Sequence, residues 1–153
     1  MTLGDELKLK LIVPSQGGLV SMKVRDLFRV TMILVFIQIA LGGLLTFDYI
    51  SWIPHAITGF IVLALAIVTL IVAQTSKPPF RPLQGLSIGL VLAIVVQIIL
   101  GFLTLNTGNL AIAWVHLLVA VGIYGMVVSG TFMSMRLNYH SREQPATGAG
   151  PQI

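Results

Sequence analysis

Two histidines occupy matching positions in a duplicated stretch of this chain. The first copy reads Gln-Ile-Ala-Leu-Gly from Gln38 and reaches His55, and the second reads Gln-Ile-Ile-Leu-Gly from Gln97 and reaches His116. The glutamine precedes the histidine by 17 residues in the first copy and by 19 in the second. Neutral imidazole is a common ligand for metal ions in proteins. The repeat therefore predicts that both copies contribute a histidine to one site.

The residues that follow the two histidines indicate what this site holds. Gly59 and Ala120 stand four residues after His55 and His116, and positions i and i+4 share a face of a helix. A small residue beside each imidazole leaves room for a flat macrocycle, and imidazole is an axial ligand of heme iron. We therefore expect a heme bound by His55 and His116, with Gly59 and Ala120 against it.

Two other readings of the histidines remain open. They could be buried groups that hydrogen-bond to glutamine, serine or backbone without any cofactor. A zinc or copper site is disfavoured, because such sites need a third protein ligand and the sequence places no other histidine or carboxylate well for it. His140 follows the last apolar stretch, and we expect it in the cytoplasmic tail, on the opposite side of the membrane from the other two histidines.

The elements that position the histidines are expected to be membrane-spanning helices. The chain is 56% hydrophobic and 9% charged, with a mean hydropathy of +0.98. Apolar stretches near 30–47, 53–74, 86–105 and 110–135 approach or exceed the length that crosses a bilayer as a helix. These features predict an all-α integral membrane four-helix bundle, built from two repeated helical hairpins.

The distribution of charge predicts how the bundle is oriented. All nine Lys and Arg residues lie before the first stretch, between the second and third, or after the fourth. By the positive-inside rule, both termini are expected in the cytoplasm, in a multi-pass protein of the cell membrane. We expect a cytoplasmic N-terminal segment over 1–26, the transmembrane domain over 27–136, and a disordered cytoplasmic tail over 137–153. The net charge of +4 follows from this topology and predicts no nucleic-acid partner.

Other polar groups in the expected membrane region have two possible roles. Gln38 and Gln97 are expected in the middle of the membrane. They could form hydrogen bonds between helices, or they could lie beside the heme. Asp48 is the only charged residue expected on the outer side, either as a solvated loop residue or as an acid near the heme edge. Small residues such as Gly122 and Gly125 allow close helix contacts, either inside the bundle or in a self-associated dimer.

The run Gln-Ile-x-Leu-Gly, followed by a short loop and a histidine-bearing helix, resembles the heme A synthase family. The matching stretches are 38–59 and 97–120. The resemblance implies one four-helix half of a protein that usually has eight helices, with a histidine pair on the second and fourth helices. It also implies oxidation of the C8 methyl of heme O to the formyl of heme A, with heme b or heme O in the site and an unidentified electron donor.

The chain departs from the family pattern where a catalytic acid is expected. Family members usually carry a glutamate three residues before the first histidine of the substrate-binding half and an arginine directly after it, and this chain has Trp52 and Ala56 there. If the protein is a synthase, Asp48 is the candidate acid. The alternatives are a b-type cytochrome that carries electrons and a non-catalytic membrane assembly factor, each in contact with membrane lipid.

Overall fold

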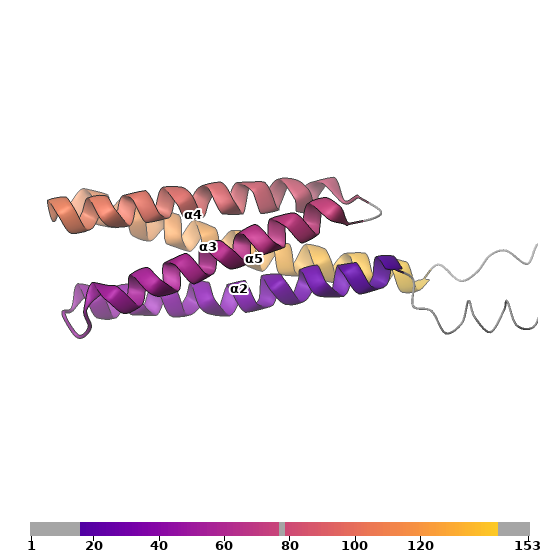
Figure 1. Cartoon of the computed structure of the whole chain (residues 1–153), viewed down its shortest axis with the longest axis horizontal. Helices are drawn as coiled ribbons and strands as arrows, with labels where there is room; N and C mark the ends of the chain where they lie inside the picture. The colour runs from indigo at the N-terminus through magenta and orange to yellow at the C-terminus, as the bar shows by residue number, and fades with distance from the viewer. Residues whose placement is uncertain (1–15, 77–78, 144–153) are drawn as a thin grey trace, which may run out of the picture.

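The computed structural model describes residues 16–76 and 79–143, and nearly all of them are helical. The helices are α2 (Gln16–Thr46), α3 (Trp52–Thr75), α4 (Arg81–Thr107) and α5 (Leu110–Glu143), which form an antiparallel bundle (Figure 1). Each contains a span that is long and apolar enough to cross a membrane: Val24–Thr46, Trp52–Thr75, Arg81–Thr107 and Leu110–Arg136. The predicted all-α membrane bundle is therefore confirmed.

The helices are arranged in a ring in their order along the chain. α2 packs on α3, α3 on α4, α4 on α5, and α5 on α2. The parallel pairs, α2 with α4 and α3 with α5, consequently stand diagonally across the bundle. This arrangement brings the histidine-bearing helices α3 and α5 to opposite sides of the central axis, one from each hairpin.

Fully buried side chains are confined to one end of the bundle. Phe28 on α2 and Leu90 on α4 are completely buried, as are the hydroxyl residues Thr69 and Ser87. These two hydroxyls donate to carbonyls of their own helices, Thr69 to Leu65 at 2.8 Å and Ser87 to Leu83 at 2.6 Å. Buried polar groups need such partners, and internal bonding lets these small residues pack where two helices approach closely. We call this end the packed half.

One layer of buried residues marks where the packed half ends. Val35, Val62, Ile94 and Ile123 come one from each helix, and each exposes only 3–4% of its surface. Val35 and Ile94 stand three residues before the two glutamines, while Val62 and Ile123 stand seven residues after the two histidines. The repeat is therefore preserved in the packing. We call these four residues the floor, because the other half of the bundle is hollow above them.

Three helices begin or end beyond the predicted boundaries. α2 runs through Gly17 and Gly18, inside the segment 1–26 expected to precede the helices, and residues 1–15 lie outside the described part. α4 begins at Arg81 because Pro82 is tolerated in a first helical turn, where its missing N–H would have no partner. α5 continues to Glu143, so part of the tail expected to be disordered over 137–153 is helical.

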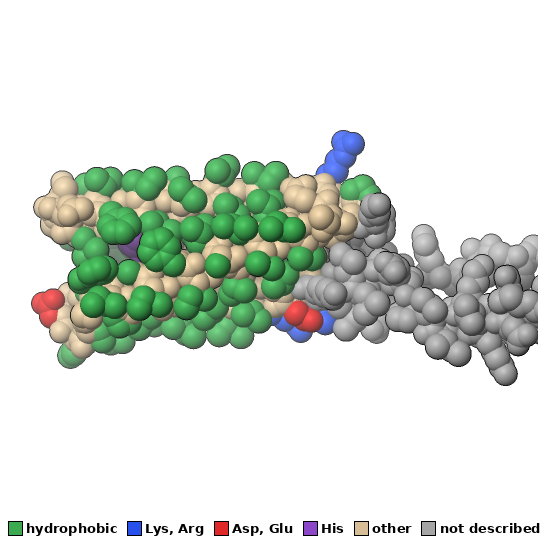
Figure 2. All heavy atoms as spheres, viewed as in Figure 1, with side chains coloured by type: hydrophobic (Ala, Val, Ile, Leu, Met, Phe, Trp, Pro, Cys, Tyr) green, Lys and Arg blue, Asp and Glu red, His purple; other side chains and the backbone are tan. Residues whose placement is uncertain are grey.

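The outward-facing surface is apolar along most of its length, as a lipid-facing surface should be (Figure 2). Its exposed side chains include Phe36, Ile61 and Leu92. Gly122 and Gly125 also face outward, because a Cβ at either would meet nothing within 4 Å. The prediction that these two glycines serve helix packing inside the bundle is thus wrong. The predicted dimer stays a prediction.

Candidate functional site

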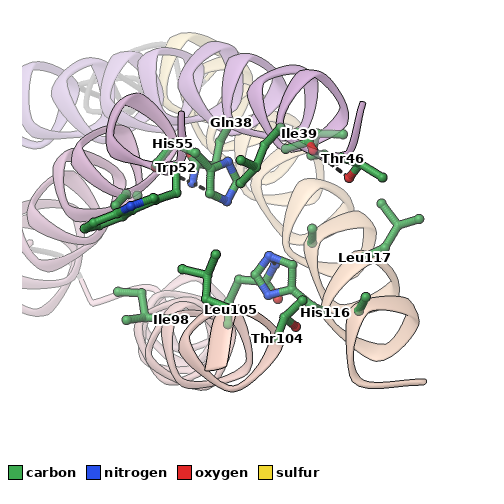
Figure 3. Close-up of a pocket in the computed structure, with 18 of the residues that line it drawn as sticks. Gln38, Ile39, Thr46, Trp52, His55, Ile98, Thr104, Leu105, His116 and Leu117 are labelled. Carbon is green, nitrogen blue, oxygen red and sulfur yellow. Dashed lines mark hydrogen bonds between the residues drawn. The ribbon is translucent and has the colours of Figure 1, made fainter. Parts of the chain in front are cut away.

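The hollow half contains the four polar residues that the repeat singled out. His55 on α3 and His116 on α5 face each other across the bundle, with ring centroids 6.2 Å apart and ring planes inclined at 57° (Figure 3). Gln38 on α2 lies beside His55, and Gln97 on α4 lies beside His116. The structure therefore brings together the two imidazoles and the two amides predicted for the site, each helix supplying one.

Each glutamine forms a hydrogen bond with the histidine of its own hairpin. Gln38 Nε2 lies 3.3 Å from His55 Nε2, and Gln97 Nε2 lies 3.1 Å from His116 Nε2. Gln38 Nε2 also donates to the His55 carbonyl, which fixes the orientation of that amide, so His55 accepts through Nε2 in the tautomer that carries its proton on Nδ1. The same tautomer of His116 accepts from Gln97 Nε2. This neutral tautomer has the Nε2 lone pair that a metal ligand requires. Hydrogen bonding between helices, the simpler of the two predicted roles for the glutamines, is confirmed.

Several polar atoms at the site have no partner in the described part of the chain. They are Nδ1 of His55 and His116 and Oε1 of Gln38 and Gln97, all buried. A buried polar atom without a hydrogen bond is costly, and most such atoms in native proteins are paired. Four of them around one pair of rings indicate a site built for a group beyond the protein itself.

Glycines on the neighbouring helices make room for the imidazoles. A Cβ at Gly42 would stand 3.1 Å from Cε1 of His55, and a Cβ at Gly101 would stand 3.2 Å from Cε1 of His116. Both distances are tighter than ordinary van der Waals contact. The glycine in each Gln-Ile-x-Leu-Gly run is thus explained by the ring that rests against it, a contact that the sequence alone did not identify.

The rings border a cavity of about 650 Å³, which lies within the roughly 300–1,000 Å³ typical of sites for small molecules and cofactors. Its floor is the layer of Val35, Val62, Ile94 and Ile123. The wall is mostly apolar. Small and aromatic residues recur in it, among them Gly42, Gly43, Ala56, Gly59, Phe60, Gly101, Phe102, Ala113, Trp114 and Ala120.

The cavity opens between α3 and α4, toward the lipid-facing surface. A second hollow, lined by Trp52, Phe102, Leu105 and Asn106, shares its first three residues with the main cavity. Figure 2 shows a histidine through an opening on this face. At the packed end of the same two helices, Gln84 on α4 donates a hydrogen bond to the Ala73 carbonyl on α3 at 3.3 Å. We call the opening the lateral portal.

Asp48 lies apart from the cavity. It is exposed in the turn after α2, with a φ of 58°, and it is not among the residues that line the cavity. Its N–H donates to the Leu45 carbonyl at 3.1 Å, and the Tyr49 N–H donates to the Leu44 carbonyl at 3.0 Å. These two bonds form a Schellman turn, in which a left-handed residue ends a helix. The structure thus gives Asp48 a position in a turn, and the acid role stays a prediction.

The residues present fit a heme better than a bare metal ion. An imidazole nitrogen binds a metal at about 2 Å and the ring centroid lies roughly 1 Å beyond it, so two imidazoles on opposite sides of one ion have centroids about 6 Å apart. The centroids of His55 and His116 match this separation. No group of three or more His, Cys, Asp or Glu side chains gathers among the described residues, so a zinc site lacks its third ligand.

Comparison of the chain with protein-family models, with curated proteins and with solved structures finds no match.

Proposed function

We propose that the protein is a heme-binding membrane protein in which His55 and His116 are the two axial ligands. The observation that carries this proposal is the facing pair of imidazoles, 6.2 Å apart, one from each hairpin of the repeat. The mostly apolar cavity around them supports it, since it provides the dry surroundings in which a porphyrin binds. Gly42 and Gly101 support it as well, because the two imidazole rings lie against them.

The roles of the protein groups follow from their positions. His55 and His116 would hold the iron of a heme through Nε2, the nitrogen that each glutamine contacts in the structure. Gly59 and Ala120 line the cavity and leave room for the porphyrin. When bound, a heme with two imidazole ligands supplies one-electron chemistry, and the protein tunes it through ligand identity, burial and nearby hydrogen bonds.

Heme A synthase activity is the function that the resemblance to that family implies, with heme O as substrate. Conversion of the heme methyl to a formyl is an oxidation that also adds an oxygen atom, so it needs an oxidant and an electron partner. The lateral portal supports this function, because a hydrophobic heme can enter from the lipid without crossing water.

Electron transfer by a b-type cytochrome is the second candidate, and the lining of the cavity favours it. No carboxylate lines the cavity in the described part of the chain, so apart from the two histidines the cavity has no acid–base side chain. Co-expression with a heme O synthase, followed by extraction of the pigment, separates the two candidates. Heme A in the extract supports the synthase, and its absence from heme-loaded protein supports the electron carrier.

Replacement of the histidines tests the site itself. We expect purified wild-type protein to show the sharp Soret band of low-spin heme, and His55→Ala or His116→Ala to abolish it, because each removes one axial ligand. His140→Ala is the matched control and should keep the wild-type spectrum. Wild-type spectra in both single variants would refute the ligand assignment, and an absent Soret band in wild type given heme would favour an assembly factor.

The orientation in the membrane is part of the proposal. The Lys and Arg side chains that the structure describes belong to the packed half of their helices, at Arg25, Arg29, Arg81 and Arg136, whereas the cavity is at the other end. Figure 2 shows blue side chains only near the packed end. We place the packed end in the cytoplasm, with both termini, and the heme near the outer face of the cell membrane. The chain has no cysteine, so single cysteines at Asn106 and Arg81 are unique probes. An impermeant thiol reagent added outside should label the first and spare the second.

A further inference from the structure

The two glutamine–histidine pairs differ in one contact. Gln38 Nε2 donates to the backbone carbonyl of His55 at 2.8 Å, in addition to its longer contact of 3.3 Å with His55 Nε2. Gln97 Nε2 has only its 3.1 Å bond to His116 Nε2 within the described part of the chain. The first amide is therefore held at two points and the second at one.

The two pairs also differ by one methyl group, in the residue that follows each histidine by four positions. Gly59, one turn after His55, lies against Gln38, and a Cβ there would stand 3.1 Å from Gln38 Nε2. The equivalent residue after His116 is Ala120, which has the methyl group that Gly59 lacks. Glycine thus leaves room for the Gln38 amide to reach the carbonyl of His55. We attribute the missing carbonyl contact of Gln97 to the methyl group of Ala120.

The difference changes what each histidine loses when its Nε2 binds iron. Gln38 gives up the longer of its two contacts and keeps its bond to the His55 carbonyl, so its nitrogen stays paired. Gln97 gives up its only bond, and because its Oε1 is already unpaired, the whole amide is left buried without a partner. An unpaired buried amide is unfavourable, so Gln97 competes with iron for His116 more strongly than Gln38 competes for His55.

We propose that the two histidines are inequivalent ligands, and that a small neutral ligand of the diatomic class replaces His116 while His55 stays bound. The proposal rests on the proposed heme binding and adds a second binding site to it, on the α5 side of the porphyrin. When His116 is displaced, its Nε2 returns to the Gln97 amide, which restores the hydrogen bond that the structure shows. The glutamine thereby stabilises the open form.

Carbon monoxide binding to the dithionite-reduced, heme-loaded protein tests the proposal. Gln97→Leu removes the competing amide and leaves an apolar side chain of similar size. It should slow carbon monoxide binding at least fivefold, because His116 then dissociates less readily. Gln38→Leu is the matched comparison and should change the rate less than Gln97→Leu does, since His55 is not the ligand that leaves. Gln84→Leu is the control and should keep the wild-type rate, because Gln84 bonds to the Ala73 carbonyl and does not line the cavity.

The exchange of small residues gives a second, independent measurement. Ala120→Gly opens the space that lets Gln97 reach the His116 carbonyl, so it should also slow carbon monoxide binding. Gly59→Ala crowds Gln38 off its carbonyl, so that Gln38 competes for His55 as Gln97 competes for His116. His55 then becomes a second ligand that can leave, and carbon monoxide binding should be faster. Equal effects of the two leucine variants, or slowing by Gln38→Leu alone, would overturn the proposal. A wild-type protein that shows no low-spin heme spectrum would instead overturn the proposed function, so the two failures are distinguishable.

Discussion

The two halves of the bundle are built from the same four helices but differ in how tightly their side chains pack. In the packed half, side chains such as Phe28 and Leu90 fill the space between helices, and hydroxyls bond within their own helices. In the hollow half, glycines and alanines face a cavity, and four buried polar atoms have no partner in the described part of the chain. One half holds the fold together, and the other half remains hollow.

The physical basis of this division is that helix association in lipid depends on close packing. The hydrophobic effect does not draw apolar helices together when lipid is equally apolar, so van der Waals contact must do so. Residues that line a cavity lack van der Waals contacts on the side that faces it. The packed half and the floor of Val35, Val62, Ile94 and Ile123 must therefore carry most of the stability of the ligand-free bundle.

The largest effect on stability is expected in the packed half, at Gly130. A Cβ there would overlap the ring of Phe28, which is fully buried. Overpacking of this kind costs about 1–3 kcal/mol, so Gly130→Ala should lower the unfolding free energy in detergent by that amount. Gly125→Ala on the same helix is the control and should have little effect, because a Cβ there meets nothing. Equal stability of the two variants would contradict the division into halves.

The same substitution in the hollow half should disturb the ligand more than the fold. Gly101→Ala places a methyl 3.2 Å from His116 Cε1, and the ring can yield by turning into the cavity. We expect a loss of stability below about 1 kcal/mol, together with reduced low-spin heme measured from the Soret band. Gly122→Ala is the control, since nothing lies within 4 Å of its Cβ position and it does not line the cavity. Loss of folding without loss of heme from the folded fraction would argue against a site at this glycine.

A third prediction concerns entry to the hollow half. Leu105→Trp places a larger side chain in the lateral portal, so it should slow heme uptake from liposomes several-fold while leaving the final heme content unchanged. Leu103→Trp is the matched control. Leu103 is exposed on the same helix but does not line the cavity, so uptake should proceed at the wild-type rate. Equal slowing by both variants would point to a general effect on α4.

Sequence reasoning predicted the helices and the pairing of the histidines because both depend on local patterns. Apolar runs of membrane length predict the helices, and the repeat brings His55 and His116 to the same depth. The hollow half could not be predicted, because it depends on which faces of four helices meet. Gly42 is an example. The repeat identifies it as a conserved position of the two copies, but its contact with the ring of His55 depends on how α2 and α3 pack and cannot be read from the sequence.

The helix ends show a second limit of sequence reasoning. Polar composition predicted disorder after residue 136, yet α5 continues to Glu143, because charged residues such as Arg142 and Glu143 favour helix once they lie beyond the membrane. The role of Asp48 also depended on geometry. Its distance from His55 along the chain gave no indication that it ends α2 in a left-handed turn.

The smallest effect is expected at Asp48, on the rim of the hollow half. A left-handed conformation costs a residue with a side chain about 1–2 kcal/mol, although aspartate and asparagine tolerate it better than most. Asp48→Gly should therefore raise the unfolding free energy by up to about 1 kcal/mol, and Asp48→Asn should leave it unchanged. Both variants should keep the wild-type Soret band, since Asp48 does not line the cavity. Chemical denaturation and absorption spectra of the same samples measure the two properties.

If heme A is formed in wild type and Asp48→Asn abolishes it without changing stability or heme content, the carboxylate acts in catalysis. In that case the turn must bring it to the heme edge, and the rim belongs to the site. If heme A formation is unchanged, Asp48 serves only to end α2, and the chemistry of the hollow half lies with its histidines and glutamines.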